Sequence, residues 1–400
     1  MASKHSRTGI WLIGARGGLA TTLIAGTRMM AKKLAPSAGL LSDGPLGAGI
    51  PWAPLSSLEF GGHDIRRGTL RESASEVAAA THCFPQGALA AIGKDLDAVD
   101  GRIRMGAAQN CGPAIQKLHG GRAKAASPRV QLRQFRRDLR EFRAKNRLQQ
   151  LVVVNVASTE PPLRSASHHR SMEGLLAAIR ANSQSIRSSE IYGAAAALEA
   201  DVVINFTPNE GFLCAGVRDI AEIRGVLYMG SDGKTGETLV KSALAPMFHY
   251  RNLKVLSWMG FNLLGDGDGE VLRDPAHKAA KVRNKDGILA RILGYAPDSL
   301  VRIDYVKSLG DNKTAWDFVH FEGFLGHKMC LQLTWSGTDS VLAAPLILDM
   351  VRLALVARAR GETGCMKQLA LFFKAPLDVS EDNLHRQYES LARWMAEAAG

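Results

Sequence analysis

Short apolar runs alternate with helical patterns along most of the chain. Nearly continuous apolar runs begin at residues 9, 57, 151, 201 and 253, with the sequences GIWLIGA, SLEFGGHDI, LVVVNVAST, DVVINFTPN and LKVLSWMG. Strands that are buried on both faces of a parallel sheet have this composition, because helices cover each face. Helical patterns separate the runs, so the sequence predicts a doubly wound α/β sheet.

The pattern changes between about residues 234 and 340. Glycine and charge increase there, and the residues from 301 to 337 alternate like antiparallel strands with one solvated face. Residues 340–361 then have the composition of a long, mostly buried helix that ends at Gly361. We therefore expect a Rossmann-like nucleotide-binding domain formed by residues 1–233 and 340–400, with an inserted α+β domain over residues 234–339.

Composition is consistent with a folded, soluble protein. The chain has 400 residues, of which 46% are hydrophobic, so it can bury a large core. Arg16 and the glycines after it interrupt the apolar N-terminal run before a signal-peptide cleavage site, and no other stretch is apolar enough for a membrane span. The five cysteines are scattered without CxxC spacing, which is typical of a reducing compartment and argues against a zinc or iron–sulfur site. We expect a cytoplasmic protein with no membrane partner.

A formal net charge of +12 raises the question of a nucleic-acid partner. The densest basic run, residues 132–147, places Leu132, Phe135, Leu139 and Phe142 at helical spacing, so its arginines form the outer face of an amphipathic helix. The sequence adds no aromatic platform and no nucleic-acid-binding motif to this run. We expect no nucleic-acid partner, since the same field attracts any anion, including phosphorylated sugars.

A glycine turn follows the first apolar run. Glycines there let the backbone approach a pyrophosphate, and the N-terminus of the next helix, which starts near residue 19, meets its charge. The spacing departs from GxGxxG, and a tight strand-to-helix turn without a ligand is the alternative. The ribose-binding acid expected about 20 residues further on is Asp43, while Asp64 ends the second run and could instead shape the adenine side. The residues of the turn are Gly14, Ala15, Arg16, Gly17, Gly18 and Leu19.

Polar residues follow two of the predicted strands, and each group begins with an asparagine. Ligands of open α/β sheets lie outside the carboxyl ends of the strands, where these residues would face a nucleotide. The alternative is that they cap helices or shape turns. The first group is Asn155, Ser158, Thr159 and Glu160, and the second is Asn205, Thr207, Pro208 and Asn209.

Four lysines in the second half of the chain have unusual settings. Lys281 and Lys285 are one helical turn apart, so on a helix they would share a face. Lys313 lies in LGDNKTAW, and Lys374 lies in the apolar segment LFFKAP. A lysine that is removed from water has a lowered pKa and can act as a base, an acid or an oxyanion partner near neutral pH. The alternative for each is a solvated surface ammonium.

Acidic residues near these lysines suggest a bound cation. Asp266 and Asp268 could help hold a divalent or monovalent cation together with a phosphate, although aspartates between glycines often only form turns. We assign no metal-ligating residue, and His168 and His169 in SASHHRS resemble a solvated loop more than a metal pair. The aspartates in glycine-containing turns are Asp232, Asp268 and Asp339.

The order of these motifs resembles the myo-inositol-1-phosphate synthase family over nearly the whole chain. The resemblance runs from the glycine turn through GGHDI, NVASTEPP, INFTPNEG, GSDGKTGET, NLLGDGDGEVL, LGDNKTAWDF and SVLAAPLILD to FFKAP. No single motif is specific, but their order and spacing together are. Two segments depart from the family: its asparagine-rich turn is GDGDG at residues 265–269, and the approach to the paired lysines is HKAAKVRNK. Because of these departures, we expect phosphate binding or the preferred metal ion to differ from those of relatives.

The resemblance implies an NAD-dependent, redox-neutral cyclisation of glucose 6-phosphate to 1D-myo-inositol 3-phosphate, as used in inositol and phospholipid biosynthesis. In such enzymes C5 is oxidised, C6 is enolised, an internal aldol reaction closes the ring, and the hydride returns. The resemblance also implies a homotetramer in which the inserted strands extend a sheet across a subunit interface. The implied active-site positions are Lys281, Lys285, Lys313, Lys374, Asp232, Asp268 and Asp339. The implied NAD contacts are the glycine turn with Asp64, Asn155, Ser158, Thr159, Thr207, Asp232, Asp268 and Asp339.

Clustered lysines suit this chemistry, because enolisation needs a base and a cationic environment, and ring closure needs a proton donor at the aldehyde oxygen. Lys374 and Lys281 are expected to handle protons at the C5 oxygen and the enolate. Lys313 and Lys285 are expected to hold the phosphate or the aldehyde oxygen, with Asp268 and Asp339 orienting the lysines and the nicotinamide. Three alternatives stay open: an NAD-dependent oxidoreductase that releases NADH, a paralogous cyclase acting on another sugar phosphate, and a nucleotide-sensing protein without catalysis.

Overall fold

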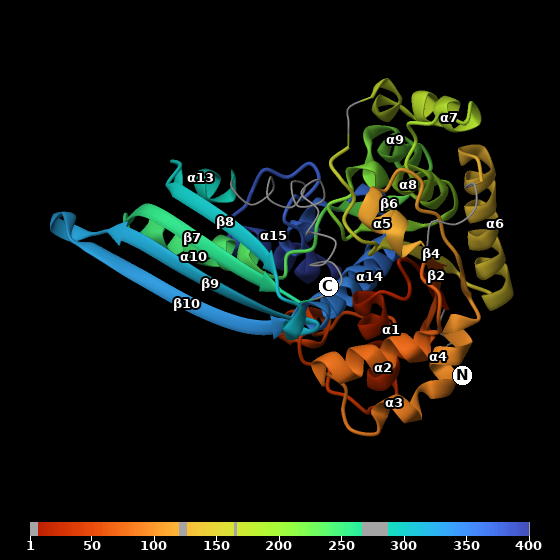
Figure 1. The fold of residues 1–400 in the computed structure, drawn as a ribbon, viewed down its shortest axis with the longest axis horizontal. Helices are drawn as coiled ribbons and strands as arrows, with labels where there is room; N and C mark the ends of the chain where they lie inside the picture. The colour runs from red at the N-terminus through yellow and green to blue at the C-terminus, as the bar shows by residue number, and fades with distance from the viewer. Residues whose placement is uncertain (1–6, 120–125, 164–165, 266–286, 400) are drawn as a thin grey trace.

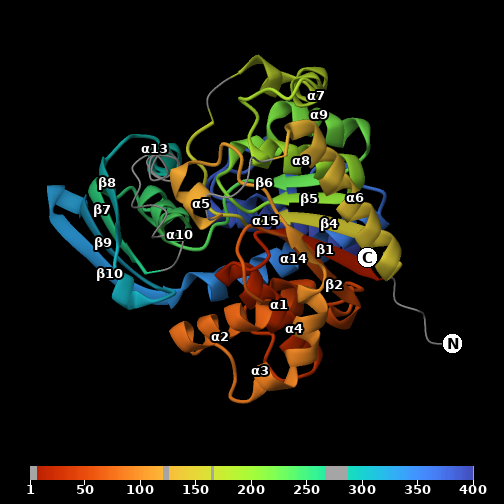
Figure 2. The same cartoon turned by 45° about the vertical axis from the view of Figure 1, so that its right-hand side comes forward.

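Two β-sheets organise the protein. The computed structural model describes residues 7–119, 126–163, 166–265 and 287–399. One sheet has seven strands and the other has four. The four-stranded sheet projects from the larger body as an arm (Figures 1 and 2).

The seven-stranded sheet is parallel throughout, with the order β11-β6-β5-β4-β1-β2-β3. The apolar runs that begin at residues 9, 57, 151 and 201 form β1, β2, β4 and β5, which confirms the predicted α/β class. The strand order reverses beside β1, so a crevice opens there at the carboxyl ends of the strands. The strands are β1 Thr8–Ile13, β2 Leu58–Asp64, β3 Ile103–Met105, β4 Gln150–Asn155, β5 Val202–Asn205, β6 Leu227–Gly230 and β11 Gly364–Cys365.

Alternate residues of the central strands enter two separate cores, one on each face of the sheet. Ile10 and Val152 point into one core, whereas Trp11 and Val153 point into the other. Because both faces are buried, these strands are apolar at nearly every position, as the sequence suggested. The first core contains α1 Gly18–Ala31, α2 Leu70–Thr81, α3 Ala88–Ala91, α4 Gly93–Asp100, α14 Asp339–Ala359 and α15 Leu384–Ala399. The second contains α6 Pro128–Asn146, α7 Met172–Arg180, α8 Ser188–Glu199 and α9 Ala215–Ile223.

Two helices were predicted from the pattern and are confirmed. Helix α14 ends two residues before Gly361, whose φ of 78° lies in the left-handed region that favours glycine. By length and composition α14 could cross a membrane, but 67% of its apolar window is buried inside the protein, where it packs on α1. Helix α6 buries Phe135, Leu139 and Phe142 and carries its arginines on the other side. Part of the basic charge of α6 is paired, since Glu199 binds two of these arginines.

The four-stranded sheet is mixed, with the order β10-β9-β7-β8. Its strands are β7 Lys254–Leu264, β8 Asp298–Tyr305, β9 Asn312–Glu322 and β10 Lys328–Thr338. Strand β7 is antiparallel to β9 and parallel to β8, and β9 is antiparallel to β10. All four strands lie within residues 234–339, and the exact domain boundaries stay a prediction.

The prediction that the apolar run at residue 253 joins the parallel sheet is wrong, because this run forms β7 of the second sheet. Helices α10 Glu237–Tyr250 and α13 Gly287–Leu293 cover one face of that sheet, where Val255 and Trp258 are buried. Positions on the opposite side of β7, such as Met259 and Phe261, are also apolar. The run therefore has the composition of a strand buried on both faces although helices cover only one.

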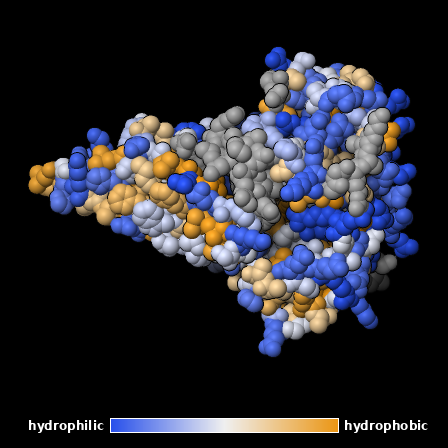
Figure 3. Space-filling view, viewed as in Figure 1, coloured by the Kyte–Doolittle hydropathy of each residue, from blue (hydrophilic) through white to orange (hydrophobic). Residues whose placement is uncertain are grey.

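The uncovered side of the second sheet faces solvent, as the alternation predicted, but an apolar patch on β7, β8 and β9 lies among its polar residues, which include Arg302, Thr314 and Gln332. Trp316 is 37% exposed and Leu300 is 47% exposed on this side, and the ring of Phe261 lies 5.4 Å from that of Trp316 between centroids. Figure 3 shows hydrophobic residues along the arm and at its tip, where Phe324 and Leu325 are almost fully exposed. We call this surface the outer face; its residues are Met259, Phe261, Leu263, Leu300, Trp316 and Phe318.

The close packing of β2 against the end of β1 gives a stability prediction. A methyl group at Gly62 would lie 2.6 Å from the Ala15 Cβ and closer still to the Leu12 carbonyl oxygen. We expect Gly62→Ala to lower the free energy of unfolding by about 1–3 kcal/mol, because backbone must move to make room. Urea denaturation followed by circular dichroism measures this change.

Gly26 in the middle of α1 provides the matched control, since a methyl group there would meet nothing within 4 Å. We expect Gly26→Ala to raise the free energy of unfolding by about 0.5–1 kcal/mol through helix propensity. Equal stability of the two variants would contradict the packing described here.

Candidate active site

Two adjoining hollows lie along the carboxyl ends of the parallel strands. They measure about 660 and 920 Å³, counted with the part that is open to solvent, and they share Gly17, Arg66, Val156, Ala157 and Ser158. We refer to them together as the cleft. The first half extends past Asp64 toward Tyr192, and the second extends past Thr207 toward Lys374 and Asp339.

The glycine turn forms the middle of the cleft. Gly14 has a φ of 93°, and a methyl group there would lie 3.0 Å from the Ala157 Cα, so this position requires glycine. Helix α1 begins at Gly18 with no capping side chain and no acidic residue in its first turn, which leaves its N-terminal N–H groups directed at the cleft. Gly14, Gly17, Gly18 and Leu19 line the cleft. This arrangement has the features that suit a phosphate group.

Two other residues of the turn have a structural role. Ala15 is fully buried. Arg16 turns its guanidinium away from the cleft lining, with Nη2 2.9 Å from the Asp100 carboxylate. Neither residue is among those that line the cleft.

Asp64 holds the turn in place from the end of β2. Its two carboxylate oxygens accept hydrogen bonds from the backbone N–H groups of Arg16, at 2.6 Å, and Arg66, at 2.7 Å. Asp64 is buried and also lines the first half of the cleft. Asp43, the other predicted acid, lies in the short turn Leu41–Asp43 and binds Arg352 of α14 at 2.6 Å. Asp43 does not line the cleft, so its assignment as the ribose-binding acid is wrong.

The asparagines at the strand ends form a buried network. The Asn155 side chain donates to Asn205 Oδ1 at 3.1 Å and to Thr207 Oγ1 at 3.0 Å. Asn209 donates to the Ser158 carbonyl oxygen at 3.0 Å and accepts from the Glu160 N–H at 2.7 Å. Asn205 thus acts through its neighbours, while the other predicted residues of these two segments line the cleft: Asn155, Ser158, Thr159, Glu160, Thr207, Pro208 and Asn209.

Asp232 and Lys374 meet at one end of the cleft. The Lys374 ammonium lies 2.8 Å from Asp232 Oδ1, and the Lys374 N–H donates to the Asp232 carbonyl oxygen at 2.7 Å. Ser231 and Ala375 exchange two backbone hydrogen bonds, in which the N–H of each donates to the carbonyl oxygen of the other, and these bonds align the two segments. Asp232 has a φ of 63°, an uncommon value for a residue with a side chain. The side chain of Lys374 is 13% exposed, as its apolar sequence setting suggested.

Lys313 reaches the cleft region from the second sheet. It is buried on β9, with its ammonium 3.6 Å from Asp339 Oδ1 and 5.4 Å from the centre of the Trp335 ring. Thr235 donates to the same Asp339 oxygen at 3.1 Å. Asp339 is the first residue of α14 rather than part of a glycine-containing turn, so it joins the second sheet to the core of the first. Of the other predicted residues, Lys281, Lys285, Asp266 and Asp268 lie outside the described residues.

Two residues were missed in the sequence: Asp311, which lines the cleft, and Lys234, which lies between the lining residues Gly233 and Thr235. Asp311 lines the cleft close to Gly18, and the Ser340 hydroxyl donates to its carboxylate at 2.6 Å. Burial, with a further contribution from the charge of Asp339, raises the pKa of Asp311. Lys234 is buried with its ammonium 2.6 Å from Gln387 Oε1, and burial lowers its pKa to about 8. The only sequence signal was their position within LGDNKTAW and GSDGKTGET, beside residues already singled out.

Comparison with known proteins identifies the family of the chain. The family model described as myo-inositol-1-phosphate synthase matches residues 44–396. The chain belongs to the myo-inositol-1-phosphate synthase family. It is 31% identical over 394 residues to inositol-3-phosphate synthase 1 of Bacteroides thetaiotaomicron, covering 93% of this chain and 90% of that protein. A match at 34% identity to the inositol-3-phosphate synthase of Trypanosoma brucei brucei covers 59% of this chain and 48% of that protein, about half its length.

Solved structures support the same fold. Inositol-3-phosphate synthase from Caenorhabditis elegans superposes with a TM-score of 0.88 at 22% identity, over 99% of this chain and 86% of that one. A myo-inositol-1-phosphate synthase-related protein from Thermotoga maritima superposes with a TM-score of 0.78 at 23% identity, over 98% of both chains. Members of the family are enzymes with an NAD-binding domain, which implies NAD as the cofactor of this protein.

The role of Asp64 gives a prediction for NAD binding. We expect Asp64→Ala to weaken NAD binding by about 10- to 100-fold, because losing charge-assisted hydrogen bonds to two backbone N–H groups releases the glycine turn. Fluorescence titration of the purified protein with NAD measures the dissociation constant.

The control is Asp43→Ala, which removes the carboxylate that binds Arg352 outside the cleft. This variant should bind NAD as the wild-type protein does. If Asp64→Ala bound NAD normally, or if Asp43→Ala were the weaker binder, Asp64 would not organise the turn.

Proposed function

We propose that this protein converts glucose 6-phosphate into 1D-myo-inositol 3-phosphate with no net change in NAD. The family and the relative that matches over nearly the full length support this reaction. The single observation that carries the proposal is the arrangement of Lys374 with Asp232 and of Lys313 with Asp339, near the end of an NAD cleft. An ordinary dehydrogenase has no need of two such lysines.

The residues present fit NAD. The glycine required at position 14, the uncapped start of α1 and the wall formed by Ser158 and Thr207 suit a dinucleotide that crosses from one half of the cleft to the other. When bound, NAD would accept the hydride from C5 of the sugar and return it after ring closure. Asp64 and the asparagine network would fix the protein side of this site.

Lys374 is proposed to hold and move the proton at the C5 oxygen. An ammonium has three N–H donors, and Asp232 accepts from one of them, so others can be directed at a substrate oxygen. Asp232 would thereby orient Lys374. Lys313, held between Asp339 and Trp335, is proposed to bind the phosphate or the aldehyde oxygen. The proposed roles of Lys281 at the enolate, of Lys285 at the phosphate and of Asp268 in orienting the lysines rest on resemblance alone.

We also propose that a cation accompanies the cofactor phosphates. Asp311 places a half-buried carboxylate next to Gly18, where the first turn of α1 would receive the pyrophosphate. Two negative groups at that spot require a positive charge between them. Asp311 and Asp339 would supply carboxylate oxygens to it, a donor set that suits a divalent or monovalent cation.

The reaction itself is tested with purified protein, NAD and glucose 6-phosphate, with and without a metal chelator, by following NADH absorbance and the NMR spectrum of the sugar. We expect inositol phosphate to form without net NADH. Accumulating NADH with an open-chain product would indicate a dehydrogenase instead. If neither NADH nor a new sugar product formed, glucose 6-phosphate would be refuted as the substrate, and other sugar phosphates would then be assayed.

The lysine assignment gives a sharper prediction. We expect Lys374→Ala to reduce kcat by about 10²- to 10⁴-fold, the usual contribution of a general acid or base, with little change in NAD affinity. Lys367→Ala, which removes an exposed lysine a short distance earlier in the chain, is the matched control and should keep full activity. Full cyclase activity in Lys374→Ala would exclude Lys374 from the reaction.

We propose further that the outer face joins copies of this chain in a homotetramer. An exposed apolar surface of this kind on a folded protein marks an interaction site. Its aromatic residues, Phe261, Trp316 and Phe318, are of the type enriched at the centres of protein interfaces. A second copy presents the same surface, so the face can pair with itself.

We expect the wild-type protein to have four times the chain mass of 43.1 kDa in size-exclusion chromatography with light scattering. The double variant Trp316→Glu/Phe318→Glu should have a smaller assembly mass, because burying charges at an interface is costly. Arg133→Glu on the distant helix α6 is the control for a change of charge. A monomeric wild-type protein would refute the tetramer, and an unchanged mass of the double variant would place the contact elsewhere.

A further inference from the structure

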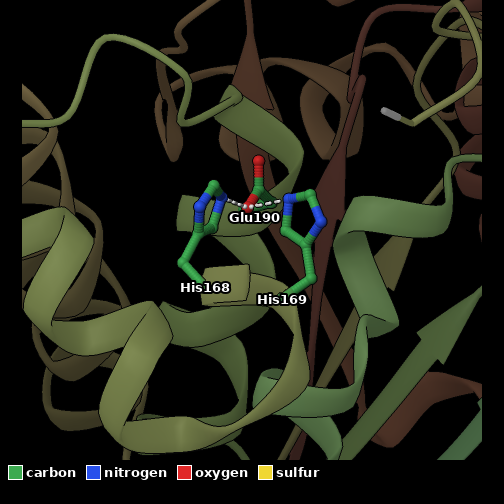
Figure 4. A group of neighbouring side chains, drawn as sticks. All are labelled: His168, His169 and Glu190. Carbon is green, nitrogen blue, oxygen red and sulfur yellow. Dashed lines mark hydrogen bonds and ion pairs between the residues drawn. The ribbon is translucent and has the colours of Figure 1, made fainter. Parts of the chain in front are cut away.

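Two histidines and a glutamate meet outside the active site. His168 and His169 are consecutive residues of the short turn Ser167–Arg170, and Glu190 lies in the first turn of α8. Both rings point at the same carboxylate (Figure 4). The histidine side chains are only 12% exposed and Glu190 is fully buried, so the prediction of a solvated loop is wrong.

The spacing of the three groups is that of ligands around a small cation. The Nε2 atoms of His168 and His169 each lie 3.1 Å from Glu190 Oε1, and the three ligand atoms lie within 4.8 Å of one another. Tetrahedral Zn²⁺ with bonds of about 2.0–2.1 Å to nitrogen and oxygen separates neighbouring ligand atoms by about 3.3 Å. The cluster therefore needs only a small adjustment to surround an ion.

We propose that His168, His169 and Glu190 form a binding site for one divalent transition-metal ion, with the ligand chemistry of Zn²⁺. Two imidazole nitrogens and one carboxylate oxygen are a donor set that zinc accepts, and water would complete the tetrahedron. Glu190 is already oriented for this role, because its second oxygen accepts the Arg187 N–H at 2.9 Å. Such outer hydrogen bonds fix the direction of a ligand.

One hydrogen bond must change when the ion enters. His169 Nδ1 accepts the Ala166 N–H at 3.2 Å, which places the ring proton on Nε2 in the metal-free protein. The ion replaces the proton at Nε2, so Nδ1 becomes the protonated nitrogen and turns away from Ala166. Metal uptake is therefore accompanied by a local movement at Ala166 and, where Glu190 or a histidine carries an extra proton, by proton release.

The position of the site suggests a structural role for the ion. Ser188 and Ser189, immediately before Glu190, line the first half of the cleft, and the Ser189 hydroxyl donates to Glu160 at 2.7 Å. The Arg187 guanidinium binds the carbonyl oxygens of Pro161 and Pro162 in the segment that leads toward the histidines. An ion at this point would fasten that segment to α8 and stiffen the wall of the NAD cleft. This inference does not depend on the proposed reaction.

The test uses full-length protein in a Cys330→Ser background, which removes the exposed cysteine as a competing ligand. After treatment with a chelator, Zn²⁺ is titrated by calorimetry and the bound metal is counted by mass spectrometry. We expect one equivalent of Zn²⁺ and a Co²⁺ derivative with the absorption of a tetrahedral N/O site. Failure of this protein to bind Zn²⁺ would overturn the proposal, whatever the variants do.

The variants assign the ion to this cluster. We expect His169→Ala and Glu190→Gln each to weaken Zn²⁺ binding by about 100-fold or more, since each removes or neutralises a ligand. Two control variants should still bind one equivalent of Zn²⁺. They are His249→Ala, at an exposed histidine, and Asp311→Asn, at the proposed active-site cation. Melting curves confirm folding, and His168→Ala provides a second ligand deletion. Unchanged Zn²⁺ binding in the ligand variants would overturn the site, leaving a hydrogen-bonded cluster only.

Discussion

The hydrogen bonds among Asn155, Asn205 and Asn209 are the constraint on which the site depends. These side chains are almost completely buried, and each unpaired polar group in such a place would cost about 1–3 kcal/mol. They bond one another, the hydroxyl groups of Thr207 and Ser231 and the neighbouring backbone, so the ends of β4 and β5 are held in one relative position. The cleft residues Ser158 and Thr207 follow directly from these ends. The sequence suggested that these asparagines bind a ligand directly. In the structure their hydrogen bonds mainly support the strand ends that carry the cleft residues.

The two sheets contribute opposite parts of the candidate chemistry. The parallel sheet supplies the dinucleotide cradle and, through the paired segments at Asp232 and Lys374, one lysine. The second sheet supplies Lys313 and Asp311 from neighbouring positions at the start of β9. Asp339 joins the two, because it touches Lys313 while forming the first residue of a core helix. Lys374 and Lys313 each have a carboxylate beside them, and Asp311 accepts a hydrogen bond from Ser340.

The parallel strands and the long helices could be predicted because apolar periodicity reports burial directly. The strand at residue 253 was assigned to the wrong sheet for the same reason, since Met259 and Phe261 give an uncovered face the composition of a buried one. Asp43 has the spacing from the glycine turn that is expected of a ribose-binding acid, whereas Asp64 stands at the end of the second strand. Only the fold decides which of the two carboxylates reaches the turn. Asp311 and the partners of His168 and His169 could not be found, because Ser340 and Glu190 are close in space but not in sequence. Tertiary contacts of this kind leave no local pattern.

The pairing of Lys374 with Asp232 spans 142 residues and has a consequence for biosynthesis. A ribosome releases the N-terminal part of a chain first, and folding proceeds as segments emerge. The residues of β1 to β6 therefore emerge before the segment that carries Lys374 and the edge strand β11. Nascent chains pass through a stage in which the glycine turn and the asparagines have been synthesised and Lys374 has not. The lysine that completes the candidate site is thus among the last of its residues to be synthesised.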